Sequence, residues 1–292
     1  MTRQSEPQPL AVVSRLGYSI AKLFCSGKPR QALSTFVSAR VKAGSGFSCR
    51  GGRTLHRRGD FDMPVICVGC PKGGVGKTTT SLILACELAN GGARVTIIDS
   101  DPNKQIAHWA TLPGVPPNLD VVSNDVNQET ILDVIDQAAA RSAFVLVDCE
   151  GIASLMVSLA VSISDLVLIP CGGSQLDAGK TAHMIQTVKQ QERVTRRSIG
   201  YAVVLTRCSP ALMPGTQKHV ERTFAERAIP VLTAKLYDRE AFKAVFSFGG
   251  TLAGLQNKIS NVDRAQMNAR VFAAEVVDRL KKAPAADAIG AA

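Results

Sequence analysis

The sequence predicts an α/β fold: a doubly wound, mostly parallel sheet flanked by helices. From residue 63 onward, short apolar runs alternate with longer amphipathic segments, which is the pattern of strands joined by crossover helices. The runs are apolar throughout, as expected for strands that are covered on both faces. A glycine-rich segment, GGVGKT at residues 73–78, lies between the first run and the first amphipathic segment. Ligands of such sheets bind beyond the carboxyl ends of the strands, so functional residues are expected there.

The expected strands are the seven apolar runs, and the expected helices are the amphipathic segments around them. The strands are expected at residues 65–69, 94–99, 120–123, 144–148, 166–170, 201–206 and 231–236. The helices are expected at residues 77–90, 128–141, 152–162, 178–192, 216–227, 238–246 and 262–282. The first helix follows the glycine-rich segment directly, which is the arrangement that a phosphate-binding loop requires.

Residues 1–62 differ from the rest of the chain in composition. They hold 11 Lys or Arg and 3 Asp or Glu, so the other 230 residues carry only +2 of the formal net charge of +10. With no sustained periodicity, such a basic, Ser- and Gly-rich segment is expected to be disordered. It is interpreted as a DNA-touching arm, as a targeting peptide, or as sequence upstream of a true start at Met63, and we favour the last. Residues 63–292 form the expected folded domain.

Composition excludes several classes of function. Aromatic residues make up 5% of the chain, which argues against a surface that stacks nucleobases. Cys67 and Cys70 form a C-x-x-C pair inside the apolar run VICVGC, but no second pair of ligands follows, so buried thiols are expected rather than a metal site. No apolar run approaches the ~20 residues of a membrane-spanning helix.

The segment GGVGKT has the residues that a phosphate-binding loop needs. Its glycines let successive backbone N–H groups turn toward one anion, and the following helix adds the positive end of its dipole. Lys77 can then reach the β- and γ-phosphates, and the Thr78 hydroxyl can ligate Mg²⁺. Asp148 ends an apolar run, where a buried carboxylate needs a cation such as magnesium. Lys72, at the front edge of the loop, is placed to reach a nucleotide held by a facing subunit.

Four segments, in this order, resemble the ParA/MinD family of ATPases. KGGVGKTTT resembles its deviant Walker A motif, with the signature lysine at Lys72. VTIIDSDPNKQIAHW resembles the strand that ends in D-x-D-P, AFVLVDCEG the apolar strand that ends in Asp, and SDLVLIPCGGSQLDAGKT the segment that follows it. The chain is most similar to the small plasmid-type ParA proteins, and Trp109 strengthens that match.

The resemblance implies an ATP-dependent dimer switch for plasmid or chromosome partition. It implies ATP and Mg²⁺ as cofactors, a homodimer, a ParB-like centromere-binding partner, non-specific DNA binding, and a cytoplasmic, nucleoid-associated protein whose weak ATPase a partner stimulates. Catalytic roles are implied for Lys72, Lys77 and Asp101, and magnesium contacts for Thr78, Asp148 and Asp101. Nucleotide contacts are implied for Lys72, Gly73, Gly74, Val75, Gly76, Lys77, Thr78, Thr79, Thr206 and Arg207.

Three residues at two places depart from the family pattern near the site. Asn103 stands where the family has Gln, and Glu150 and Gly151 replace a Pro-Pro pair. Asp99 is expected either to be a structural neighbour of Asp101 or to cap backbone amides at its strand end. Cys149 directly follows Asp148. Iron–sulfur relatives of the superfamily have cysteines near the dimer interface, but they need a second bridging cysteine, and the sequence offers no clear one, so a cluster is not expected.

Two other functions stay open at the sequence level. One is an ATPase scaffold for transfer-DNA processing or cargo positioning. The other is a MinD-like membrane ATPase, against which the Ala-, Pro- and Gly-rich tail argues, since its only bulky apolar residue is Ile289. Basic residues that could face DNA phosphates are Arg193, Arg196, Arg197, Arg270, Arg279, Lys281 and Lys282.

Overall fold

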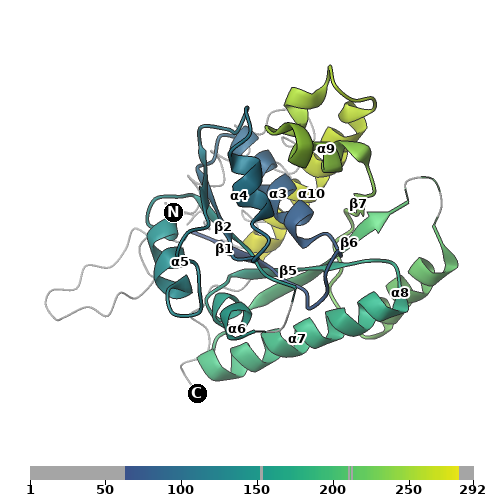
Figure 1. Ribbon diagram of the computed structural model, residues 1–292. Helices are drawn as coiled ribbons and strands as arrows, with labels where there is room; N and C mark the ends of the chain where they lie inside the picture. Colours follow the sequence, from purple (N-terminus) through teal and green to yellow (C-terminus); the bar gives the residue numbers. More distant parts are fainter. Residues whose placement is uncertain (1–62, 152–153, 210, 212, 283–292) are drawn as a thin grey trace, which may run out of the picture.

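The computed structural model describes residues 63–151, 154–209, 211 and 213–282, and of Lys282 only the backbone. The predictions for residues 1–62 and for the tail at residues 283–292 lie outside this part of the chain. The described residues form a parallel sheet with helices on both faces, so the predicted fold class is confirmed (Figure 1).

The sheet has seven strands in the described residues, in the order β3-β2-β4-β1-β5-β6-β7, and every pair is parallel. The strands are β1 (Val65–Val68), β2 (Val95–Asp99), β3 (Leu119–Val122), β4 (Phe144–Asp148), β5 (Leu166–Cys171), β6 (Gly200–Cys208) and β7 (Leu236–Tyr237). β1 lies between β4 and β5, so the glycine-rich loop that follows it leaves the middle of the sheet, where ligands of such folds bind.

The helices divide between the two faces of the sheet according to which buried cluster their apolar residues join. One face is covered by α3 (Lys77–Asn90), α4 (Gln105–Ala110), α9 (Glu240–Phe248), the 3₁₀ turn η1 (Leu252–Leu255) and α10 (Val262–Lys282). The other face is covered by α5 (Ile131–Ala139), α6 (Leu155–Ser162), α7 (Gln175–Thr195) and α8 (Gly215–Glu226). Figure 1 shows the first group above the sheet and the second below it.

The predicted strand at residues 231–236 is wrong for most of its length. Only Val231 bridges to β6, through Val203, and regular pairing begins at Leu236. The backbone N–H groups of Thr233 and Ala234 donate instead to the Glu275 carboxylate of α10, at 2.8 and 2.7 Å. A side chain from another element thus replaces the neighbouring strand as hydrogen-bond acceptor, which the local sequence does not reveal.

Helix boundaries follow their caps. α3 and α10 begin and end where the sequence predicts. α7 starts three residues earlier than expected, because the Ser174 side chain and Asp177 form a reciprocal capping box at its N-terminus. α4 was not predicted, since six residues are too few to show a helical period.

Candidate nucleotide-binding site

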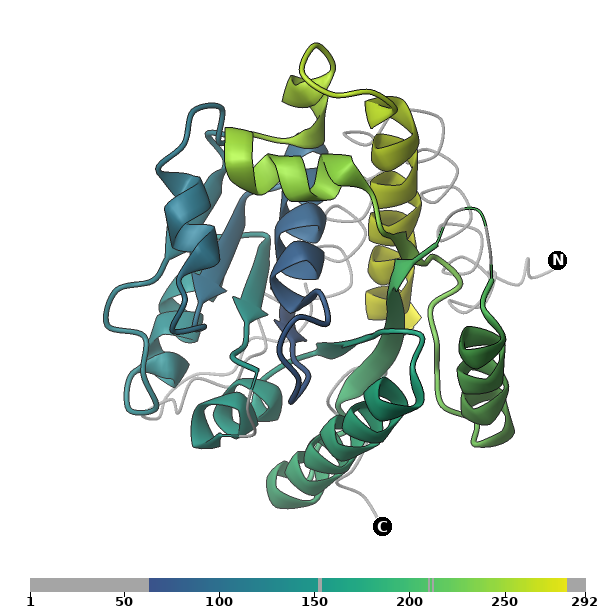
Figure 2. The same cartoon turned by 45° about the vertical axis from the view of Figure 1, so that its right-hand side comes forward.

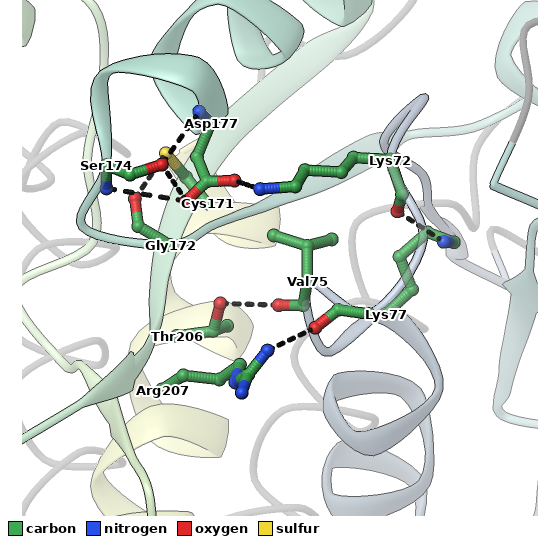
Figure 3. A network of polar contacts seen from close by, with 10 residues as sticks. Lys72, Val75, Lys77, Cys171, Gly172, Ser174, Asp177, Thr206 and Arg207 are labelled. Carbon is green, nitrogen blue, oxygen red and sulfur yellow. Dashed lines mark hydrogen bonds and ion pairs between the residues drawn. The ribbon is translucent and has the colours of Figure 1, made fainter.

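The loop between β1 and α3 is built as an anion cradle. Gly74 and Gly76 have φ values of 72° and 96°, which side-chain-bearing residues rarely adopt. β6 holds the loop from behind: the Thr206 hydroxyl donates to the Val75 carbonyl at 2.7 Å and the Arg207 guanidinium to the Gly74 carbonyl at 2.9 Å (Figure 3). With these carbonyls bound from behind, the loop N–H groups are left to face an anion.

A cavity of about 720 Å³ opens in front of this loop, a volume that suits a nucleotide. Its walls come from the loop and α3, from the connection between β2 and α4, from residues 150–151, and from the β6–β7–α9 region. The lining residues are Gly73, Gly74, Gly76, Lys77, Thr78, Thr79, Thr80, Asp101, Pro102, Asn103, Gln105, Glu150, Gly151, Thr206, Arg207, Leu236, Tyr237, Asp238, Arg239, Phe242 and Lys243. Most of the residues that we expected to contact the nucleotide are among them; Lys72 and Val75 are not.

Lys77 lies against the loop itself. It is 5% exposed, and its ammonium donates to the Lys72 carbonyl at 3.0 Å. Gly151 closes this corner, because a Cβ there would lie 3.1 Å from Lys77 Nζ and 3.4 Å from the Gly73 nitrogen. Glycine at this position therefore replaces the family's proline without obstructing the lysine.

Lys72 turns away from the cavity. Its ammonium forms an ion pair with the Asp177 carboxylate in the first turn of α7, as Figure 3 shows. Burial alone raises the pKa of Asp177, but the hydrogen bonds from Lys72 and Ser174 outweigh it and hold that pKa below its usual value. The lysine side chain remains 37% exposed, so the contact is accessible from outside the subunit.

Asp148 and Asp99 are paired across β4 and β2, and both are fully buried. Asp148 accepts a hydrogen bond from the Ser81 hydroxyl at 2.7 Å, while its second oxygen has no partner. Burial raises the pKa of Asp148 to about 7, although the nearby Ser81 and Thr78 hydroxyls act to lower it. A buried carboxylate oxygen without a donor, beside the Thr78 hydroxyl, fits a magnesium site.

Asp99 has the capping role. Its Oδ2 accepts from the N–H groups of Ile106 and Ala107 in the first turn of α4, at 3.1 and 2.9 Å. Asp101, two residues on, lines the cavity and holds its own loop, because its Oδ1 accepts from the backbone and side-chain N–H groups of Asn103. The shorter amide of Asn103 thus makes a contact within its own loop.

A family model described as VirC1 protein matches residues 63–283. The chain belongs to this family. Over 221 residues it is 39% identical to "Protein ParA" of Rhizobium radiobacter, covering 76% of this chain and 99% of that protein. This VirC1-family chain is therefore a ParA-like P-loop ATPase.

Solved structures support the fold of this VirC1-family protein. Apo McdA of Cyanothece aligns with a TM-score of 0.58 at 16% identity, over 73% of this chain and 99% of that one. A plasmid partition protein of Borrelia burgdorferi B31, described as putative and bound to AMPPNP, aligns with a TM-score of 0.53 at 15% identity, over 72% and 98%.

Two parts of the VirC1-family site were missed by sequence reasoning. Asp177 lies in the S-x-x-D pattern of a capping box, which was a usable signal for its position but not for its contact with Lys72. The cavity-lining residues from the end of β7 into α9 follow the strand that was predicted wrongly; they are Tyr237, Asp238, Arg239, Phe242 and Lys243.

The cysteines and the basic residues have mainly structural surroundings. Cys67 and Cys149 lie side by side in the core, with their sulfurs 3.2 Å apart.

Of the basic residues expected to face DNA, Arg197 and Arg279 donate to backbone carbonyls, and Lys281 pairs with Asp278. Arg193 and Arg196 are exposed at the end of α7.

None of the helices within residues 63–282 combines the length and apolar character that crossing a bilayer requires.

Proposed function

We propose that this VirC1-family ATPase is an ATP-operated dimer switch that binds DNA without sequence preference and serves DNA partition. One observation carries the proposal: the side chains of two lysines five residues apart lie in different surroundings. Lys77 lines the cavity of its own chain, whereas Lys72 lies outside that cavity on an accessible face. A cation so placed is suited to a triphosphate held by a second copy.

The surroundings of Lys72 suit an interface. Leu176, next to Asp177, is 79% exposed, and Leu155 at the start of the neighbouring helix α6 is 59% exposed. Exposed large apolar side chains beside a charged pair are typical of a surface that a partner covers. In our proposal, a second copy covers these leucines, and Lys72 exchanges Asp177 for the γ-phosphate of that copy's nucleotide.

In this proposal the cavity residues have different roles in ATP hydrolysis. The loop amides and Lys77 hold the β- and γ-phosphates, and Thr206 and Arg207 keep the loop in place. Thr78, Asp148 and Asp101 are the residues that would hold Mg²⁺, which supplies charge neutralisation at the phosphates. Asp101 orients the water whose oxygen attacks the γ-phosphorus as ADP leaves. Loss of the γ-phosphate returns Lys72 to Asp177, and the dimer opens.

Intrinsic hydrolysis is expected to be slow, since one oxygen of the Asp101 carboxylate is already engaged by the backbone and side-chain N–H groups of Asn103 in its own loop. A partner that reorders this loop would raise the rate. A ParB-like centromere-binding protein is the expected partner. Because the ATP-bound dimer binds DNA in this proposal, it is expected on the nucleoid, in the cytoplasm.

DNA binding by the full chain tests this function. With a non-hydrolysable ATP analogue and Mg²⁺, the protein should shift random-sequence duplexes, with no preference between sequences of equal length. Affinity should fall on the order of 100-fold or more between 50 and 200 mM salt if several phosphates are neutralised. Without nucleotide, or with Lys77→Ala, the shift should disappear.

The two alternative functions predict other results in these binding experiments. DNA binding that ignores nucleotide, or no DNA binding at all, would favour a scaffold that uses the nucleotide as a structural ligand. Co-sedimentation with anionic liposomes only when ATP is present would favour a membrane ATPase instead.

A further inference from the structure

The cavity is bordered by two segments that are far apart in the sequence. On one side are Asp101, Pro102, Asn103 and Gln105, from the connection between β2 and α4. On another are Arg239, Phe242 and Lys243, from the start of α9. The first set is near the carboxylate pair of β2 and β4. The second set follows β7, beside the end of β6, and we assign the base to this side of the cavity.

These two segments are joined behind the cavity by Trp109. The side chain is fully buried in α4, and its indole N–H donates to the carbonyl of Gly250, just after α9, at 3.1 Å. Figure 2 shows α9 lying across the end of α3 and toward α4. Trp109, Ile106 of α4 and Phe242 of α9 belong to one buried cluster.

The backbones at this junction are in direct contact. Gly249 has a φ of 75°, and a Cβ there would lie 2.5 Å from Leu112 Cβ and 2.6 Å from the Pro113 oxygen. A Cβ on Gly114 would lie 3.2 Å from the Gly250 Cα. Only glycines permit this approach, so a displacement of the end of α9 must move the residues that follow α4.

α4 is in turn fixed to the Asp101 loop. Its first turn is capped by Asp99 through Ile106 and Ala107. Lys104, immediately before α4, donates its backbone N–H to the Asp101 carbonyl at 3.0 Å and its ammonium to the Asp99 carbonyl at 2.8 Å. A six-residue helix held at both ends moves as one body, so its movement reaches Asp101.

We propose that Trp109 is a positioning residue for hydrolysis: through Gly250 it couples the base-side helix α9 to the Asp101 loop, so that a bound adenine base aligns Asp101 with the γ-phosphate. The inference rests on the proposed ATP hydrolysis. It adds that the base, although remote from the reacting atoms, contributes to the rate and not only to affinity.

The kinetic test compares ATP with inorganic tripolyphosphate, which has the phosphates without the base, both with Mg²⁺. The wild-type chain should turn over bound ATP faster than bound tripolyphosphate. Trp109→Phe keeps an aromatic ring but removes the N–H donor. It should lower kcat for ATP about fivefold, the change in rate that corresponds to the net free energy of one hydrogen bond, with little change in KM. Turnover of tripolyphosphate should not change.

Phe272→Leu is the matched control, because Phe272 is fully buried in the same cluster but on α10. A change in packing alone should affect both substrates by the same factor. If Trp109→Phe keeps the wild-type ratio of the two rates, or if the wild type turns over both substrates equally, the coupling is wrong.

A spectroscopic test does not depend on turnover. Trp109 is the only tryptophan of the chain, so its emission reports on this junction alone. Saturating ADP should shift that emission, whereas saturating pyrophosphate should not. In Gly249→Ala, where the new Cβ displaces Leu112 and Pro113, the response to ADP should be lost. Equal responses to ADP and pyrophosphate, or no response to ADP, would overturn the inference.

The two proposals fail differently. A wild-type chain that shifts its emission with ADP yet hydrolyses neither substrate would contradict the proposed function; the response of the Trp109 junction to the base would remain, but without a role in hydrolysis. Normal ATP hydrolysis that is insensitive to Trp109→Phe would contradict the coupling through Trp109 and leave the proposed function intact.

Discussion

At the scale of single residues, the two loop lysines show how neighbours in sequence can serve different places. Lys77 is buried and donates to the Lys72 carbonyl, whereas the Lys72 side chain reaches the other way, to Asp177. The Lys72 ion pair is partly exposed, and such pairs contribute about 1 kcal/mol or less. A competing triphosphate, with several negative charges, can therefore displace Asp177 at small cost.

Asp101→Ala should separate closure of the dimer from hydrolysis. Asp101 lines the cavity but is not one of the loop residues that cradle the phosphates, so nucleotide affinity should change little. Loss of an oriented water should slow turnover about 100-fold or more, the usual worth of such a group. The variant should therefore accumulate as an ATP-bound dimer in size-exclusion chromatography with light scattering. Turnover at the wild-type rate would show that Asp101 does not position the water.

The residues that the sequence predicted best are those whose roles follow from local spacing. Lys77, Thr78 and the glycines occur within one short motif, and Asp148 ends a strand that the pattern places correctly. The contact of Lys72 with Asp177 and that of Trp109 with Gly250 span 105 and 141 residues. Pairs so distant leave no trace in local periodicity, so only the folded chain reveals them.

At the scale of elements, α3 and α10 enclose a carboxyl group in an apolar interface. Glu87 of α3 is 6% exposed, and burial raises its pKa to about 7, although Arg270 of α10 and Asn90 act to lower it. A carboxyl whose pKa is higher in the folded than in the unfolded chain binds more protons in the folded state. Its contribution to stability is therefore lost as pH rises through about 7.

Glu87→Gln should remove this pH dependence. Between pH 6 and pH 8 the wild type should lose roughly 1 kcal/mol of unfolding free energy through Glu87, and the variant should not. Asp148, whose pKa is also about 7, titrates in both proteins, so the difference between their urea unfolding curves isolates Glu87. Parallel losses in the two proteins would place the titrating group elsewhere.

Elements were predictable where an apolar period ran long enough. The bounds of α3, α10 and β4 agree with the sequence prediction. β7 was misplaced because Glu275 of α10 takes over the N–H groups of Thr233 and Ala234, and α4 was missed because it is short. Both elements border the cavity or its junction.

At the scale of the whole molecule, the front edge of the phosphate loop meets the start of α7 through the Lys72–Asp177 ion pair, whose lysine is partly exposed. The central claim is that occupancy of the cavity and pairing of two copies are one event, because Lys72 serves the triphosphate of the other copy. The fold alone does not require this; the placement of Lys72 outside its own cavity is what suggests it.

The most direct test is the mass in solution of the wild type and of Lys72→Ala, each saturated with a non-hydrolysable ATP analogue and Mg²⁺. The substitution keeps the backbone carbonyl to which Lys77 donates. Nucleotide affinity should therefore stay within about threefold of the wild-type value, a smaller change than the tenfold loss that 1.4 kcal/mol of binding free energy would give. The account predicts a dimer for the wild type and a monomer for the variant. A wild-type chain that stays monomeric at high concentration, or a variant that dimerises as readily, would contradict it.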